Sequence, residues 1–394
     1  MIKITNPADC CGCTACASIC PHNAITMKPN LLGFLYPVVD ESKCMECGLC
    51  EKVCAFNDHY DCTLVLQQPE AYAARHRNID EVLKSRSGAA FVAISDYILE
   101  VGGVVYGAGY KDHFRVAHKR AITKEERDEF RGSKYVQSDL TGVFRLVKKD
   151  LVDGLIVLFS GTPCQTAALN SYISEKLRKS LVLVDIICHG VPGPYIWRDY
   201  LAYRERQAGD ELCCVNFRDK KYGWASHIES FKFRRRDKES CVYSTLFNEN
   251  IVLRQSCGIC HYCNLKRPSD ITIADFWGGG TSAPNFFADN KGCSLMLINT
   301  EKGQEILKAI QNKIDTKKVP LEKCMQPNLQ YPTLIHPKRD MFEKDYEKFG
   351  FEKTLRKYGY LGWQQVLREL KRKYRMHLSE KLPASWKAHI KRII

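Results

Sequence analysis

The sequence predicts an α+β protein that consists of a cysteine-rich N-terminal module, a larger α/β body and a basic helical C-terminal tail. Three observations support this prediction: two cysteine runs of identical spacing, alternating strand and helix patterns in the middle of the chain, and a cationic amphipathic pattern near its end. With 394 residues, 45% of them hydrophobic, the chain can form two or three domains with a sizeable core. The expected divisions are residues 1–60, 68–145, 146–325 and 326–394.

The two cysteine runs predict the chemistry of the N-terminal module. Both have the spacing C-x2-C-x2-C-x3-C, and they comprise Cys10, Cys13, Cys16 and Cys20, and then Cys44, Cys47, Cys50 and Cys54. Such spacing places three thiolates around one face of a cubane iron–sulfur cluster, and in paired runs the fourth cysteine binds the other cluster. The pattern is typical of a bacterial-type dicluster ferredoxin module.

The expected ligand sets follow from this crossing of the fourth cysteines. One 4Fe-4S cluster is expected on Cys10, Cys13, Cys16 and Cys54, and the other on Cys44, Cys47, Cys50 and Cys20. Cys11 lies beside the first ligand and is expected to be a spare thiol of that loop. The alternative is a pair of structural zinc sites, but zinc cysteines usually occur as separated C-x2-C pairs.

Composition argues against several other classes of protein. Twenty cysteines suggest a disulfide framework only in a short secreted chain, and residues 1–7 contain no apolar signal core. No apolar stretch approaches the roughly 18 residues of a membrane span. We therefore expect reduced, metal-binding cysteines in a cytoplasmic protein. The net charge of +14 suggests nucleic acid, but no recognition motif with interleaved aromatic residues is present, so nucleic-acid binding is not expected.

The body begins where strand and helix patterns start to alternate. Strands are expected at 71–74 and 104–108, with a helix between them that ends near residue 100. After a helix around 194–207, the residues up to Trp277 are expected to be rich in strands. A final strand–helix unit is expected from Ser294 to about residue 314.

The clearest unit of the body is a parallel crossover. Apolar strands at 155–159 and 181–187 flank a helix, which is typical of strands buried on both faces of a sheet. Ligands bind at the carboxyl ends of such strands, so the loops that begin at Ser160 and Cys188 are candidate site loops. The helix-starting Pro163 is compatible with an anion-binding loop or simply with a well-capped helix.

A second group of cysteines lies in this body. Cys257 and Cys260 form a C-x2-C pair with Cys263 three residues later, and Cys164 and Cys188 lie in the two strand-end loops. Four of these five thiols can converge on a third metal site. Spacing alone is as compatible with zinc as with iron–sulfur at this site.

Several sequence blocks carry a resemblance to a known family. They are GSKYVQS at 132–138, SGTPCQ at 160–165, DIICHGVP at 185–192, RDKKYGW at 218–224 and DITIADFWG at 270–278, which follows the Cys257–Cys260 pair. With these motifs in this order, the chain resembles the family of coenzyme F420 hydrogenase/dehydrogenase beta subunits. That family includes deazaflavin-oxidising subunits and 7-hydroxymethyl chlorophyll a reductase, and the resemblance covers roughly residues 1–300.

The resemblance implies non-covalent FAD beside an iron–sulfur cluster that is fed by further clusters. The flavin-site residues that it implies are Ser87, Gly88, Ser133, Lys134, Gly161, Thr162, Asp275 and Trp277. The ligands that it implies for a third 4Fe-4S cluster are Cys164, Cys188, Cys257 and Cys260. Cys263 departs from the family pattern and is an alternative to one of these four.

The implied function is an iron–sulfur flavoprotein oxidoreductase that passes electrons between the clusters, FAD and an organic substrate, because a flavin takes two electrons and releases them singly. Candidate cations for reduced flavin are Lys134, Lys220 and Lys221, and His189 is a candidate proton relay; the alternative is that these are ordinary surface or structural groups. Ferredoxin or another redox protein is the expected partner. The alternatives are a coenzyme F420-oxidising or -reducing subunit with a deazaflavin substrate, a non-catalytic electron-transfer module and a cluster-stabilised scaffold.

The tail concentrates the basic charge of the chain. Residues 353–394 contain 12 Lys and Arg against two Glu. Apolar residues recur at helical spacing, and they comprise Trp363, Val366, Leu367, Leu370, Tyr374 and Leu378, followed after Pro383 by Trp386, Ile390 and Ile393. Such a helix can lie on an anionic membrane surface, which would place the protein peripherally at the inner membrane face. The alternative is that the apolar stripe packs on the body or on a partner protein.

Overall fold

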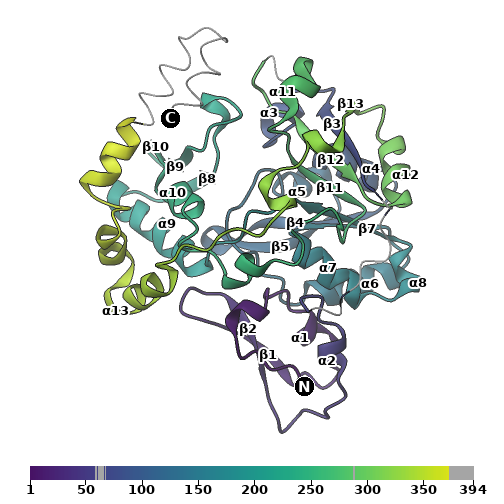
Figure 1. Ribbon diagram of the computed structural model, residues 1–394, viewed down its shortest axis with the longest axis horizontal. Coiled ribbons are helices and arrows are strands. Elements are labelled where there is room, and N and C mark those ends of the chain that lie inside the picture. The colour runs from purple at the N-terminus through teal and green to yellow at the C-terminus, as the bar shows by residue number, and fades with distance from the viewer. Residues whose placement is uncertain (58–59, 61–65, 67, 287–288, 372–394) are drawn as a thin grey trace.

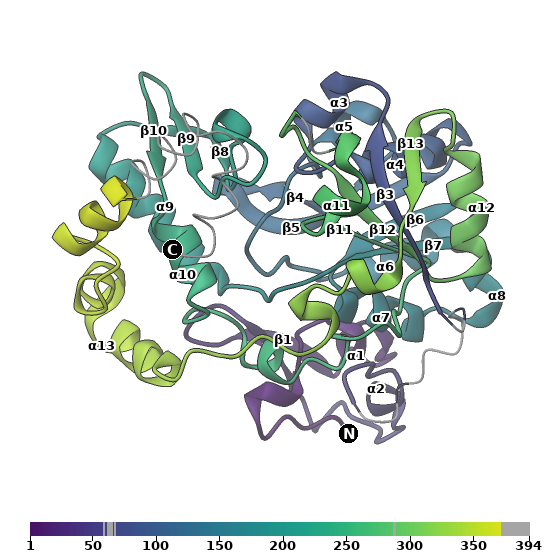
Figure 2. The same ribbon diagram turned by 45° about the horizontal axis from the view of Figure 1, so that its top comes forward.

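The computed structural model describes residues 1–57, 60, 66, 68–286 and 289–371. The N-terminal module lies below the rest of the molecule in both views (Figures 1 and 2). Its elements are η1 (Pro7–Asp9), α1 (Ala15–Ile19), β1 (Ile25–Pro29), β2 (Leu35–Val39) and α2 (Leu49–Lys52). β1 and β2 form an antiparallel pair, and each short helix follows one cysteine loop. The module therefore contains the same loop–helix unit twice, as the cysteine spacing predicts.

The body is built on an eight-stranded mixed sheet with strand order β13-β3-β12-β11-β7-β6-β4-β5. The strands are β3 (Glu70–His76), β4 (Val104–Lys111), β5 (Arg115–Ala121), β6 (Val157–Gly161), β7 (Leu181–Ile186), β11 (Ile271–Asp275), β12 (Ser294–Ile298) and β13 (Ile314–Lys318). The four central strands β11, β7, β6 and β4 are parallel, and the flanking strands are antiparallel. The expected crossover between the strands near 155 and 181 is thus present at the centre of the sheet.

Helices cover both faces of this sheet. Those of one face are α3 (Ile79–Lys84), α4 (Ala90–Glu100), α5 (Lys124–Asp128) and α12 (Glu301–Ala309), and those of the other are α6 (Val143–Val152), α7 (Pro163–Tyr172) and α8 (Glu175–Arg178). Alternation along β6 shows the two faces, because Leu158 packs with α4 whereas Val157 and Phe159 pack with α6 and α7. α1 of the N-terminal module contacts α6 and α7, so the module is seated on that second face.

A smaller sheet forms a second wall of the molecule, at the left of Figure 1. It consists of β8 (Leu212–Asn216), β9 (Glu229–Phe233) and β10 (Asp237–Ser240), covered by α9 (Pro194–Ala208), α10 (Val242–Asn248) and α13 (Arg339–Lys357). The short elements are η2 (Asp112–Phe114), η3 (Lys220–Tyr222), η4 (Gln255–Ile259), α11 (Gly279–Ser282), η5 (Pro284–Phe286), η6 (Leu321–Lys323) and η7 (Pro327–Leu329). The stretch predicted to be rich in strands therefore also contains α10, because Tyr243 and Leu246 are buried in an aromatic core with Trp197.

The described part of the tail begins as a packed helix and ends as an exposed one. Phe342 and Leu355 of α13 are fully buried, so this segment belongs to the body rather than to a free tail. Residues 363–371 are helical, and their polar face packs inward: the Cys241 amide donates to Glu369 Oε1 at 3.4 Å, and Gln365 is 4% exposed. The remaining stripe residues, namely Tyr374, Leu378, Trp386, Ile390 and Ile393, lie outside the described residues. Among the described helices, none is both long and apolar enough to span a membrane.

Candidate functional site

The two cysteine loops follow the same backbone path. In the first loop Gly12 and Thr14 have φ angles of 70° and 68°, and at the equivalent positions of the second loop Glu46 and Gly48 have 48° and 72°. These left-handed residues turn the chain so that successive cysteines face one side of the loop. A backbone N–H also points at sulfur, because Gly12 N donates to Cys10 Sγ at 3.4 Å. The repeated spacing therefore produces a repeated thiol cradle.

The structure brings together the first expected ligand set, including the cysteine from the second run. Burial raises the pKa of Cys54 to about 11, and Cys13 and Cys10 contribute to that shift. Burial likewise raises the pKa of Cys16, which lies within electrostatic range of Cys13, Cys10 and Cys54. These two thiols thus share one neighbourhood although they come from different runs.

The second expected set lines one small cavity of the module. Cys20 of the first run lies there with Cys44, Cys47 and Cys50 of the second. Backbone N–H groups donate to two of these sulfurs, from Ala24 to Cys20 at 3.3 Å and from Ile2 to Cys50 at 3.3 Å. No group of three or more His, Cys, Asp or Glu side chains in the described ranges is placed to hold a single metal ion. A cubane differs from such a site, since each thiolate binds its own iron atom.

A third set of thiols lies where the module meets the sheet. Cys164 is in the first turn of α7, which starts with Pro163 and with a capping box between Thr162 and Gln165. Cys188 lies two residues after the end of β7, and its pKa is raised by burial and by the neighbouring Cys257 and Cys164. The expected four cysteines therefore meet, since Cys260 also lies within electrostatic range of Cys164.

Cys263 belongs to the same neighbourhood. Its thiol hydrogen-bonds with Cys260, which lowers the pKa of Cys263 and raises that of Cys260. Cys188 and Cys257 also lie within electrostatic range of it. Because five thiols gather here rather than four, the alternative in which Cys263 replaces one of the expected ligands stays open.

Cys11 connects the module to the third thiol set. Its thiol hydrogen-bonds with Cys13 on one side and with Cys164 on the other, and these bonds raise its pKa. The residue is 5% exposed, so the contact is shielded from water. Sequence reasoning assigned Cys11 the role of a spare thiol, but it lies at the junction between two of the three thiol sets.

A buried arginine lies at the same junction. Arg254 is fully buried, and its guanidinium donates to Cys10 O at 2.7 Å, to Gln137 Oε1 at 2.9 Å and to Leu35 O at 2.9 Å. It is close enough to lower the pKa of Cys164 electrostatically, although the Cys11 hydrogen bond is the largest cause of that lowering. A Cβ on Gly12 would lie 2.6 Å from Arg254 Nη1, so the glycine makes room for this cation. Sequence reasoning missed this residue, because no local pattern marks it.

A cavity of about 480 Å³ opens at the carboxyl ends of β6, β7 and β11. Its lining brings together most of the predicted cofactor residues, namely Ser87, Ser133, Lys134, Gly161, Thr162, Asp275 and Trp277, with His189 and Cys188 beside them. Gly88 is not part of that lining. A Cβ there would overlap Ala74 O, so this glycine lets the loop pack against β3. The volume is in the range of small-molecule and cofactor sites.

The two predicted catalytic lysines bind backbone carbonyl groups. Lys134 Nζ donates to Glu129 O at 2.6 Å and to Arg131 O at 2.9 Å, and burial lowers its pKa to about 7. Lys220 Nζ donates to Val82 O at 2.6 Å and lies outside the cavity lining; burial lowers its pKa to about 7 as well. Both side chains therefore fix loops that border the cavity, and their catalytic role stays a prediction.

His189 begins a row of aromatic contacts that crosses the cavity wall. Its Nε2 lies 2.6 Å from Asn250 Oδ1, and its ring is 4.9 Å from that of Phe247. Phe247 stacks on Tyr135 with ring centroids 4.5 Å apart, and the Tyr135 hydroxyl accepts from Arg218 Nη1 at 3.2 Å. The row leads from the third thiol set to the far side of the cavity, because His189 directly follows Cys188.

Asp275 organises that far side. Its carboxylate accepts from Arg218 Nη1 at 2.7 Å and from Trp224 Nε1 at 2.8 Å. Trp224 in turn stacks on Trp277 with centroids 4.9 Å apart and an interplanar angle of 12°. The expectation for Asp275 and Trp277 rested on the family motif, and Arg218 and Trp224 lie in the RDKKYGW block but were not singled out.

A chain of hydrogen bonds holds the Gly161 loop from behind. His118 Nε2 lies 2.9 Å from Ser160 O, and its Nδ1 lies 2.9 Å from the Ser138 hydroxyl. Gln165 Nε2 donates to Ser138 Oγ at 3.0 Å, which closes the chain at the start of α7. Burial lowers the pKa of His118 to about 4, so the ring is neutral at neutral pH.

Two parts of the chain match known protein families. Residues 155–323 match the family model for the C terminus of the beta subunit of coenzyme F420 hydrogenase/dehydrogenase, and residues 9–57 match the 4Fe-4S dicluster domain. One of the subunits of the F(420)H(2) dehydrogenase of Methanosarcina mazei is 21% identical over 363 residues, which are 88% of this chain and 95% of that protein. A chain of the F420-reducing [NiFe] hydrogenase complex from Methanosarcina barkeri is 18% identical over 78% of this chain and 97% of that chain, with a TM-score of 0.46.

The two family matches confirm the resemblance that the sequence motifs indicated. They cover the two cysteine runs at one end and the strands that carry the third thiol set at the other. The chain therefore combines a region that matches the C-terminal domain of coenzyme F420 hydrogenase/dehydrogenase beta subunits with a 4Fe-4S dicluster domain.

Proposed function

We propose that the protein is an iron–sulfur flavoprotein oxidoreductase that passes electrons between three 4Fe-4S clusters and FAD, and between FAD and an organic substrate. One observation carries the proposal: Cys188 belongs to the third thiol set and also lines the cavity. Cys11 makes a similar connection between the first and third sets through its bonds to Cys13 and Cys164. The thiol sets and the cavity thus form one continuous series.

The donor chemistry of the thiol sets fits cubane clusters. A 4Fe-4S cluster takes four soft anionic ligands, and each set offers at least four thiols with backbone N–H groups or a buried cation nearby. The proposed ligands are Cys10, Cys13, Cys16 and Cys54 for the first cluster, Cys20, Cys44, Cys47 and Cys50 for the second, and Cys164, Cys188, Cys257 and Cys260 for the third. Arg254 would offset negative charge on the first and third.

The cavity also fits a flavin. Gly132 lines it with φ at 77° and with no described atom within 4 Å of a built Cβ, so a flat group can approach the backbone there. Three guanidinium groups line it, namely those of Arg86, Arg131 and Arg218, whereas Asp275 is the one carboxylate among its described lining residues, and this balance suits the two phosphates of FAD. When bound, FAD would take two electrons as a hydride and release them one at a time.

The residues of this chain would bind and orient the ligands. Thr162 and Gln165 fix the Gly161 loop, and Lys134 fixes the loop that contains Ser133. His189 is the candidate for holding a proton. Because Asn250 Oδ1 can only accept, Nε2 of His189 carries hydrogen, and Nδ1 is the atom that would take up a proton.

The direct test of this proposal is the cofactor content of protein purified without oxygen. Iron, acid-labile sulfide and released flavin are measured per chain. About twelve irons and one FAD are expected, from three 4Fe-4S clusters and one flavin. About eight irons with no flavin, even after incubation with FAD, would instead indicate an electron-transfer module that docks on another enzyme.

A second candidate function is oxidation or reduction of coenzyme F420 itself. It is favoured by the family match and by the similar protein of Methanosarcina mazei, whose name includes F(420)H(2) dehydrogenase. Anaerobic mixing with reduced coenzyme F420 tests it, because reduction of the proposed flavin by this donor would bleach the flavin absorbance. Reduced ferredoxin is the corresponding electron donor in the first proposal. Only one of these two donors, ferredoxin or coenzyme F420, is expected to reduce the flavin.

We further propose that the tail contacts an anionic membrane surface. The apolar face of the helix at 363–371 points away from the body, with Trp363 71% exposed, Val366 54% and Leu370 57%. Its polar face holds it to the body through Glu369. The described part of the apolar stripe therefore does not pack on this chain, and the 12 basic residues of 353–394 complement anionic lipid.

Co-sedimentation with vesicles of anionic phospholipid tests the tail. Trp363→Ser combined with Leu370→Ser is expected to weaken binding about tenfold or more, because each buried apolar side chain contributes roughly 1.5–3 kcal/mol. Leu334→Ser, at an apolar residue that is 85% exposed outside the tail helix, is the control and should bind like the wild type. Wild-type protein that ignores anionic vesicles would contradict the proposal.

A further inference from the structure

Two side chains in the loop between α3 and α4 carry hydrogen-bond donors with no partner in the described part of the chain. Ser85 is 9% exposed, and its hydroxyl has no hydrogen-bond partner there. Arg86 Nη1 donates to Arg218 O at 2.6 Å, whereas its buried Nε and Nη2 have no partner. Both residues line the cavity. Burial lowers the pKa of Arg86 to about 10, and the neighbouring Arg218 cation lowers it further.

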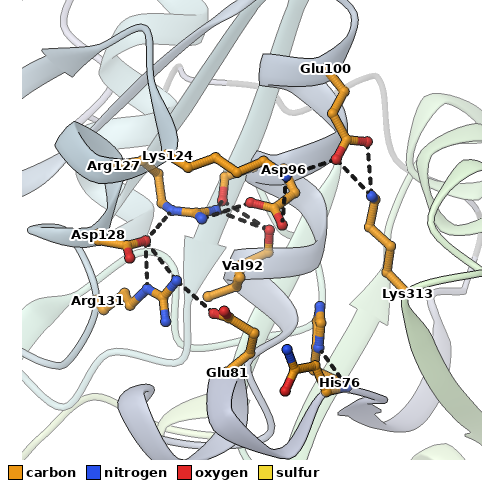
Figure 3. Close-up of polar contacts among 12 residues, drawn as sticks. His76, Glu81, Val92, Asp96, Glu100, Lys124, Arg127, Asp128, Arg131 and Lys313 are labelled. Carbon is orange, nitrogen blue, oxygen red and sulfur yellow. Dashed lines mark hydrogen bonds and ion pairs between the residues drawn. The ribbon is translucent and has the colours of Figure 1, made fainter.

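A third side chain with an unpartnered donor lines the same cavity. Arg131 has a side chain that is 8% exposed, and its Nη2 forms ion pairs with Glu81 and Asp128, both at 2.6 Å (Figure 3). Its buried Nη1 has no partner among the described residues. The pair with Glu81 joins the loop at 131 to α3, which directly precedes Ser85. Arg131 and the Ser85–Arg86 segment are therefore held on one side of the cavity.

The start of α4 lies beside these donors. This helix has 11 residues, its N-cap Ala89 has φ at 63° and provides no side-chain hydrogen bond, and Ala89 and Ala90 both line the cavity. The first N–H groups of a helix and its dipole favour an anion. Figure 3 shows how α4 is fixed, since Arg127 binds Asp96 of this helix at 2.6 Å. The helix start is thus a stable part of the cavity wall.

We propose that Ser85, Arg86 and Arg131 form, with the N-terminus of α4, a subsite that binds a phosphate group of a ligand in the cavity. The free Nε and Nη2 of Arg86, Nη1 of Arg131, the Ser85 hydroxyl and helix N–H groups match the many acceptor oxygens of a phosphate. The one carboxylate of the described lining does not serve these donors, because Asp275 already accepts from Arg218 and Trp224. Leaving buried donors unpaired is costly, so this arrangement is explained by an anion that satisfies them.

The phosphate has two potential sources. It can belong to the diphosphate of the flavin, in which case the subsite rests on the proposed function. It can also belong to a separate phosphorylated substrate, and in that case the subsite does not depend on FAD. The row from His189 through Phe247 and Tyr135 ends at Arg218, whose carbonyl accepts from Arg86, so it runs from the third thiol set to this subsite.

Inorganic pyrophosphate is the probe for the subsite itself. Its binding is measured by calorimetry under argon, on full-length protein that contains its iron–sulfur clusters and from which flavin has been removed. Arg86→Gln is expected to weaken this binding at least tenfold, the usual effect of losing a charge-assisted hydrogen bond. Arg77→Gln removes a more exposed arginine that pairs with Asp315 at 2.9 Å, and it should bind like the wild type.

Two results would overturn the subsite. One is wild-type protein that binds no pyrophosphate at millimolar concentration, and the other is equal binding by wild type and Arg86→Gln. Arg86→Lys keeps the charge but loses the fork, so it should bind with intermediate affinity. The Arg86→Lys variant also replaces Arg86→Gln in this test if Arg86→Gln loses iron or circular dichroism signal.

Flavin binding then distinguishes the two sources. If the phosphate is that of FAD, Arg86→Gln weakens FAD at least tenfold and leaves riboflavin, which has no phosphate, unchanged; bound FAD also blocks pyrophosphate. If the source is a separate ligand, FAD binds both proteins equally and pyrophosphate still binds the FAD-loaded wild type. If no flavin binds at all, the proposed function fails while the pyrophosphate result still decides the subsite.

Discussion

The thiol junction and the cavity are neighbours, but they differ in whether their hydrogen-bond donors have acceptors within the protein. At the junction Arg254 uses its guanidinium on three protein acceptors, and backbone N–H groups donate to sulfur. In the cavity Ser85, Arg86 and Arg131 keep donors without partners among the described residues. The difference indicates that the junction is built to hold permanent groups in fixed positions, whereas the cavity wall is completed by a ligand.

Removing two thiols from the junction should give the largest effect. Cys257→Ser combined with Cys260→Ser is expected to lose about four irons per chain, because the proposed third cluster would lose two of its ligands, while the N-terminal module should retain about eight. Iron and sulfide analysis after anaerobic purification measures this. Cys213→Ser combined with Cys214→Ser is the control, since both of these thiols are exposed. An unchanged iron content would show that Cys257 and Cys260 hold no third cluster.

Arg254→Met tests whether the buried cation holds the junction together. The substitution leaves Gln137 Oε1 buried without its donor, at a cost of roughly 1–3 kcal/mol, and also removes the donor of the partly buried Cys10 O and Leu35 O. We expect iron to be released to a chelator at least tenfold faster from the first and third clusters, but not from the second. Arg235→Met, at a side chain that is 71% exposed, is the control. Equal release rates would mean that the arginine does not hold the junction together.

His118→Gln has the smallest expected effect and tests a part of the cavity wall whose bonds are already satisfied. The folded-state pKa of His118 is about 4, below the roughly 6.5 of an unfolded chain, so the unfolded state binds more protons between these values. Its contribution to stability is complete above pH 6.5 and is lost as the pH falls towards 4. At pH 5 the loss is about 2 kcal/mol relative to pH 7.

Thermal unfolding at several pH values measures this contribution. The Tm of the wild type should fall between pH 7 and pH 5 by about 2 °C more than that of His118→Gln. His113→Gln changes an exposed histidine of the same hairpin and should keep the wild-type pH dependence. If His118→Gln keeps it as well, the buried ring does not control acid stability.

The sequence predicted the features that depend on short-range spacing. The cysteine runs predicted the module because three thiols within seven residues constrain the loop directly. The apolar runs at 155–159 and 181–187 predicted β6 (Val157–Gly161) and β7 (Leu181–Ile186) to within two residues. The strand-rich prediction up to Trp277 missed α10, since its buried face is determined by contacts with Trp197 of another element.

The residues that sequence reasoning missed in the site are those defined by long-range contacts. Arg254 reaches Cys10, which lies 244 positions away in the chain. Arg86 and Arg131 come to one cavity through the pair of Arg131 with Glu81, and nothing in their local sequences indicates this. The flavin-site residues could be expected only from the family resemblance, because no spacing rule connects Ser87 with Asp275.

We propose that electrons pass between the N-terminal module and the cavity through the third thiol set. The most direct measurement is anaerobic mixing of the FAD-loaded protein with reduced ferredoxin, with flavin and cluster bleaching followed separately. In the wild type, cluster reduction should be followed by flavin reduction. In Cys257→Ser with Cys260→Ser, the module clusters should be reduced while the flavin stays oxidised. Flavin reduction at the wild-type rate in that variant would show that electrons do not pass through the third thiol set.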